Sequence, residues 1–117
     1  MAYVSQDDKK RLSVGIKKVL KKYDVKATIG IRNHSTLRVK IKSGPLDFGP
    51  IDEYFGQDVN VYWIEKHYEG PAAEFLTELY REMRGDQWFD KSDSQTDYFH
   101  VSHYCDIDIL PTYQKVA

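Results

Sequence analysis

Hydrophobic and polar residues alternate near the C-terminal end of the chain, in the stretch YFHVSHYCDIDIL (98–110). One row is apolar except for His103, and its other members are Phe99, Val101, Cys105, Ile107 and Ile109. The row between them contains Tyr98, His100, Ser102, Tyr104, Asp106 and Asp108. Because successive side chains of a β-strand point to opposite faces, this pattern predicts a long strand with one buried face.

Two earlier stretches show the same alternation: KATIGIR (26–32) and TLRVKIK (36–42). A short connection, Asn33-His34-Ser35, separates them, and Asn is common in tight turns. The two stretches therefore predict a β-hairpin.

Helical spacing appears in two segments. The first follows Ser5 as N-cap, with Asp8 completing a capping box, and is expected to end near Lys22 or Tyr23. Its interior Gly15 indicates a close packing contact. The second opens at Gly70-Pro71 and ends at Gly85, with an apolar stripe of Phe75, Leu76, Leu79, Tyr80 and Met83. Residues 61–68 fit both a short helix and a strand, and we favour the helix; residues 43–60 predict an irregular loop.

The order α-β-β-(α)-α-β predicts an α+β fold, a three-stranded antiparallel sheet with two to three helices packed on one face. We expect a single domain over 1–117, with an ordered core over 5–110 and a loose tail over 111–117, because Pro111 is expected to end the last strand.

Composition places the chain among soluble globular proteins, with 41% hydrophobic and 30% charged residues. It has one cysteine, no apolar run long enough to span a membrane and no signal-peptide core, so we expect a cytoplasmic protein. The net charge of −1 is the sum of a strongly basic N-terminal part and a strongly acidic remainder. Residues 1–42 hold twelve Lys or Arg against three Asp, a net charge of +9, and residues 43–117 carry −10. The two halves either pair within the fold, form a bipolar surface or drive self-association.

The outer face of the expected sheet is the main candidate binding surface. The hairpin supplies its basic side chains and the last strand its aromatic ones, an arrangement that can contact phosphates and stack unpaired bases. The alternative is an ordinary solvated sheet face, where Lys and Arg prevent pairing with other chains. The candidate binding residues are Arg32, Asn33, His34, Arg38, Lys40, Tyr98, His100 and Tyr104.

We expect no metal site, no cofactor and no catalytic residues. His100 and His103 are three residues apart on a strand and face opposite sides, and His103 and Cys105 fall on the buried face. The acidic residues of 86–97 suit caps and turns better than a calcium loop. An enzyme would need Asn33, His34, Asp90 and Asp97 around one cleft. The sequence contains no recognised set of acid, base and nucleophile.

Three stretches together resemble one of the large polyvalent protein-associated domain families, small α+β domains of phages and plasmids. They are DDKKRLSVGIKKVLKKYDVKATIGIRNHSTLRVKIKSGPLDF (7–48), VYWIEKHYEG (61–70) and GDQWFDKSDSQTDYFHVSHYCDIDI (85–109). The resemblance extends from about Ser5 to Ile109 and implies an origin in a bacteriophage or mobile element and action inside a bacterial cell. His100 and Cys105 depart from the family's pattern, so neither is expected to be a functional group of the family.

The first hypothesis is therefore a non-enzymatic binding module that acts on a host or defence protein, as a monomer or small homo-oligomer away from membranes. The alternative is a nucleic-acid-binding module that uses the basic sheet face with its aromatic side chains.

Overall fold

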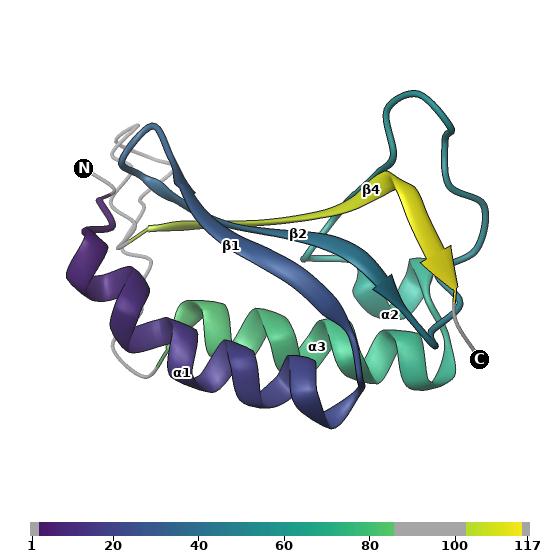
Figure 1. Cartoon of the computed structure of the whole chain (residues 1–117), viewed down its shortest axis with the longest axis horizontal. Helices are drawn as coiled ribbons and strands as arrows, with labels where there is room; N and C mark the ends of the chain where they lie inside the picture. The colour runs from purple at the N-terminus through teal and green to yellow at the C-terminus, as the bar shows by residue number, and fades with distance from the viewer. Residues whose placement is uncertain (1–2, 86–102, 116–117) are drawn as a thin grey trace, which may run out of the picture.

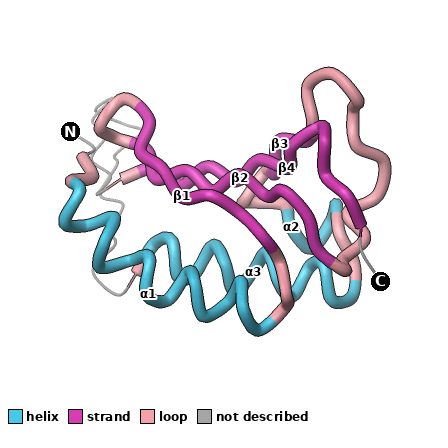
Figure 2. Tube along the Cα trace, viewed as in Figure 1, coloured by secondary structure: helices cyan, strands magenta, loops and turns pink. Residues whose placement is uncertain are grey.

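A computed structural model describes residues 3–85 and 103–115 of the chain. Its elements, in order, are α1 (Gln6–Lys22), β1 (Lys26–Arg32), β2 (Thr36–Gly44), β3 (Gln57–Val59), α2 (Ile64–His67), α3 (Gly70–Arg84) and β4 (Tyr104–Lys115). The strands form one sheet in the order β1-β2-β4-β3. Figures 1 and 2 show α1 and α3 side by side beneath this sheet. The α+β class is confirmed.

The sheet is mixed and four-stranded, so the expected three-stranded antiparallel sheet is wrong. β1 pairs with β2 antiparallel, β2 with β4 parallel and β3 with β4 antiparallel. Between β2 and β4 the chain passes through α2 and α3, and such a helical crossover returns the next strand in the same direction. The short strand β3 lies inside the stretch 43–60 that was expected to be an irregular loop.

β4 continues to Lys115, so the expectation that Pro111 ends the last strand and begins a loose tail is wrong for residues 111–115. Ile41 of β2 faces Ile109, whereas Ser43 faces Gln114, so β4 bulges between these pairs. A proline, which has no N–H to donate, fits at a bulge. The first part of the expected strand, 98–102, lies outside the described residues.

The two long helices agree with the sequence predictions. Ser5 and Asp8 form the capping box of α1, and a Cβ on Gly15 would come 2.1 Å from Glu82 Oε2 of α3. α3 begins with Pro71 in its first turn and ends at Gly85, although Tyr80 of its predicted stripe is only half-buried. α2 confirms the short helix within 61–68.

The core lies between the helices and the inner sheet face. Its fully buried side chains include Ile16 of α1, Phe75 and Leu79 of α3, and the inward row of β2 and β4: Leu37, Val39, Ile41, Ile107 and Ile109. No helix of the described part combines the length and apolar character needed to cross a membrane.

Candidate binding site on the open face of the sheet

The face of the sheet opposite α1 and α3, called the open face below, presents opposite charges on its two halves. Its strand register forms rows across the sheet: Thr28, Lys40, Asp108 and Asp58 make one row, and Gly30, Arg38 and Asp106 make the next. Lys26, Arg32 and Lys42 alternate with these residues on the same faces of β1 and β2. β1 and β2 are therefore the basic half and β3 and β4 the acidic half.

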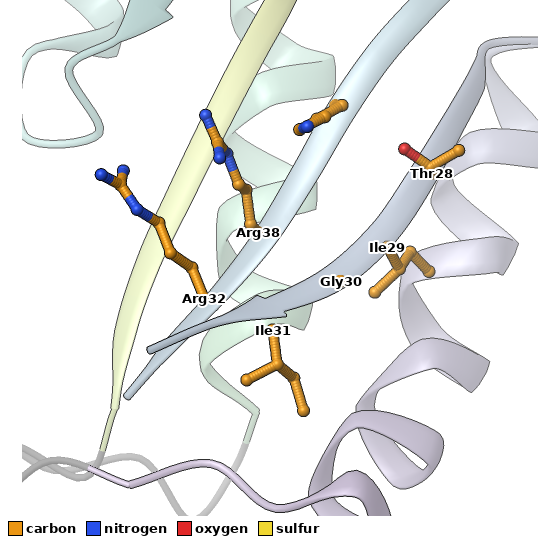
Figure 3. A pocket seen from close by; sticks show the side chains of 7 residues that line it. Thr28, Ile29, Gly30, Ile31, Arg32 and Arg38 are labelled. Atoms are coloured by element: carbon orange, nitrogen blue, oxygen red, sulfur yellow. The ribbon is translucent and has the colours of Figure 1, made fainter. Parts of the chain in front are cut away.

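Arg38 joins the two halves. Its guanidinium donates to Asp108, with Nε and Nη2 each 2.6 Å from Oδ2, and its Nε lies 3.5 Å from Asp106 Oδ2. Arg32 makes a looser pair, with Nη1 3.9 Å from Asp106 Oδ2. Figure 3 shows Arg32 and Arg38 extending from β1 and β2 toward β4, while Ile29 and Ile31 point to the opposite side.

The acidic half is a cluster of three carboxyl groups, Asp58, Asp106 and Asp108, with one oxygen from each within 4.8 Å of the others. Partial burial raises the pKa of Asp58, and the neighbouring charges of Asp106 and Asp108 raise it further. Carboxylate oxygens suit hard cations in general, but the guanidinium of Arg38 already supplies a positive charge against this cluster. The cluster is thus an acidic patch whose charge is partly compensated.

The basic half retains cations that are not compensated. Lys26, Lys40 and Lys42 are exposed, and none forms an ion pair with another described residue. Within residues 3–85 and 103–115, pairing between the two charge halves of the sequence is therefore only partial. Besides the pairs on the open face, it includes Lys22 Nζ and Glu78 Oε1 at 2.8 Å between α1 and α3.

Four of the eight predicted binding residues lie on the open face: Arg32, Arg38, Lys40 and Tyr104, the last with 48% of its surface exposed. Asn33 and His34 lie instead at the exposed tip of the β1–β2 hairpin. Both have left-handed backbone conformations, with φ of 54° and 57°, which explains the choice of Asn in this turn. Tyr98 and His100 lie outside the described residues.

The sequence prediction missed the acidic half. Asp106 and Asp108 share the alternating row of Tyr104, and that alternation was the signal that could have placed them on the open face. Asp58 had no comparable signal, because a three-residue strand is too short to show alternation.

Of the two residues expected in the core, His103 is buried, whereas Cys105 is partly buried and packs against the core. The His103 Nε2–H donates to the Met83 carbonyl oxygen at 2.8 Å. Burial raises the pKa of the Cys105 thiol to about 12, so the nucleophilic thiolate is scarce at neutral pH. Of the four residues weighed for an enzymatic cleft, Asp90 and Asp97 lie outside the described residues.

Away from the open face, a hollow of about 350 Å³ lies between residues 61–66 and α3. Its aromatic side chains already stack with cations of the chain: Lys66 Nζ lies 4.4 Å from the Trp63 ring centre, and the Arg84 guanidinium lies 4.5 Å from that of Tyr80. These contacts occupy the groups that a flat anionic ligand would use.

No protein-family model, curated protein or solved structure matches this chain significantly. The function is therefore argued from the open face itself.

Proposed function

We propose that this chain is a non-enzymatic binding module of phage or mobile-element type that engages a host or defence protein through the open face. One observation carries the proposal: Lys40 and Lys42 of β2 are exposed, form no ion pair with another described residue, and lie on the strand next to β4, which supplies two of the three clustered carboxyl groups. Lys26 extends the basic half on β1. Such a bipolar arrangement favours a partner with the complementary arrangement of charges. The origin and the host target come from the family resemblance.

The arrangement gives a partner two kinds of contact. Acidic side chains of the partner meet the lysines of β1 and β2, and a basic side chain meets Asp58 at the opposite edge. Arg38 lies between the basic and the acidic half and pairs with Asp106 and Asp108. A docked partner is thereby oriented as well as attracted.

Binding of a single-stranded nucleic acid is the second candidate. It is favoured by Arg32, Lys40 and the exposed ring of Tyr104 on one face. Asp106 and Asp108 interrupt that face and repel a phosphate backbone crossing it, so we favour a protein partner. Affinity for an oligonucleotide would fall steeply with salt, because each phosphate contact releases counterions.

The experiment compares three tagged chains: the wild type, the open-face variant Lys40→Glu/Lys42→Glu, and the control variant Lys17→Glu/Lys18→Glu. The control reverses two exposed lysines of α1 that form no ion pair with a described residue. Each chain captures proteins from bacterial lysate with and without nuclease. We expect one protein whose capture is unaffected by nuclease. The wild type and the control variant should retain it, and the open-face variant should not. Equal retention by all three chains would refute the proposal, and capture that disappears with nuclease would favour the nucleic-acid alternative.

A further inference from the structure

β1 forms a lateral edge of the sheet, and only β2 pairs with it among the described residues. Alternate residues of an edge strand direct their N–H and C=O groups away from the sheet. The N-terminal segment bonds just beyond β1, where the Val4 N–H donates to the His34 carbonyl oxygen. β1 has seven residues, which is enough for a paired strand, whereas β3 at the other edge has three.

A hollow of about 270 Å³ lies over β1 and the adjoining part of β2, lined by residues 28–32 of β1 and by Arg38 and Lys40 of β2. Gly30 lies on β1 between Ile29 and Ile31 (Figure 3), and a Cβ on Gly30 would meet no atom within 4 Å. Packing within the described part of the chain therefore does not require a glycine here, although glycine weakens a strand. A glycine inside a strand often marks the close approach of another backbone or ligand.

The side chains of β1 define what kind of strand fits beside it. On the open face, Lys26 and Arg32 are exposed cations, and β1 contains no acidic residue. On the inner face, Ile29 and Ile31 are only half-buried, and among the described residues no strand lies beyond β1. Across two adjacent strands, a charged side chain pairs most favourably with one of opposite charge, and an apolar side chain with another apolar one.

We propose that β1 accepts an extended segment of a partner protein by strand addition, and that this segment alternates acidic and apolar side chains. Its acidic row would lie beside Lys26 and Arg32, and its apolar row would cover Ile29 and Ile31. A second copy of this chain fits less well, because antiparallel pairing centred on Ile29 would oppose Lys26 of one chain to Arg32 of the other. The inference rests on the proposed function and specifies its partner.

The test uses a fluorescent seven-residue peptide, the length of β1, in which glutamate alternates with valine. Two peptides serve as controls: one with the glutamates in a single block, and one methylated on alternate backbone nitrogens so that it cannot donate along one edge. We expect the alternating peptide to bind the whole chain at low salt, to slow hydrogen exchange at β1 amides, and to bind at least about tenfold more tightly than either control.

Two variants test whether the peptide binds at β1. Gly30→Tyr fills the hollow without a clash at Cβ, and Lys26→Glu/Arg32→Glu reverses the charges beside it. Each is expected to keep its thermal transition and to weaken peptide binding about tenfold or more, whereas Lys17→Glu/Lys18→Glu binds like the wild type. A folded Lys26→Glu/Arg32→Glu chain that still binds tightly would overturn the proposal even if Gly30→Tyr failed to fold.

The outcomes separate this inference from the proposed function. If Lys40→Glu/Lys42→Glu abolishes capture of the lysate protein while no β1 amide is protected by the peptide, strand addition is refuted and the open face remains the binding site. If β1 pairs with another copy of this chain, the alternating peptide fails to bind and the proposal is likewise refuted. If capture from the lysate disappears with nuclease and the peptide does not bind, both proposals fail.

Discussion

Arg38 and Asp108 are 70 residues apart in the chain and form an ion pair of 2.6 Å across the parallel strands β2 and β4. The register sets Arg38 beside Asp106 and Lys40 beside Asp108, so the guanidinium reaches diagonally to its shorter contact. The side chains of Arg38 and Asp108 are only 31% and 19% exposed, which limits screening by solvent. This ion pair joins the basic and acidic halves of the sequence within one fold.

Replacing Arg38 by Met should destabilise the chain by about 1–2 kcal/mol at neutral pH, because it removes the guanidinium that pairs with Asp106 and Asp108 and leaves only the looser pair of Arg32 with Asp106. Urea unfolding at neutral pH measures this loss. Lys40→Met, which removes a cation without an ion pair to any described residue, is the control and should have little effect. Equal stability of the Arg38→Met and Lys40→Met chains would contradict this account.

Asp58→Asn should stabilise the chain at neutral pH. The raised pKa of Asp58 means that the folded state holds this proton more tightly than the unfolded state. The corresponding stability is present at low pH and is lost as pH rises through the raised pKa, so the wild type is penalised when Asp58 ionises. Thermal unfolding should therefore show a higher midpoint for Asp58→Asn at neutral pH and a smaller difference in acid. Glu53→Gln, at an exposed carboxyl group, should show neither effect.

Local signals predicted the helices and the hairpin because each depends on neighbouring residues. The capping box of Ser5 and Asp8, the left-handed turn at Asn33 and Pro71 at the start of α3 all act within a few residues. The same alternation placed Arg38, Lys40 and Tyr104 on one face, and this placement is confirmed.

Strand neighbours and strand direction could not be predicted in the same way. Alternation assigns a side chain to a face, but it is identical in parallel and antiparallel strands. The parallel pairing of β4 with β2 depends on the passage through α3, and the position of Asp58 depends on pairing of a three-residue strand with β4. Alternation was enough to place Asp106 and Asp108 on the open face, whereas the position of Asp58 beside them depends on this long-range pairing and could not be predicted.

Tyr113→Phe tests the C-terminal extension of β4. The Tyr113 hydroxyl donates to the carbonyl oxygens of Leu46 and Gly44, at 2.7 and 3.1 Å, and attaches β4 to the end of β2 and the chain just after it. Losing this contact should cost about 1 kcal/mol at neutral pH. Burial raises the pKa of Tyr113, so the difference from the wild type should persist until strongly alkaline pH and narrow once the hydroxyl ionises. Denaturant unfolding measures both, and Tyr62→Phe, at an exposed ring, should be neutral. No difference at neutral pH would show that this contact does not stabilise the fold.

Gly15 and Gly56 should respond in opposite directions to alanine, although both make close contacts. At Gly15, in α1, the new methyl group would meet the carboxylate end of Glu82, a flexible side chain that can move aside. Gly15→Ala should therefore gain about 0.5–1 kcal/mol from helix propensity. At Gly56, φ is +72° and the methyl group would meet the Ile109 backbone oxygen at 2.2 Å. Gly56→Ala should therefore cost more than about 1 kcal/mol, from left-handed strain and from displacement of β4. Thermal and urea unfolding of the two variants measure these effects. A loss at Gly15 equal to that at Gly56 would mean that Glu82 is held in place and that the contact between α1 and α3 tolerates no added atom.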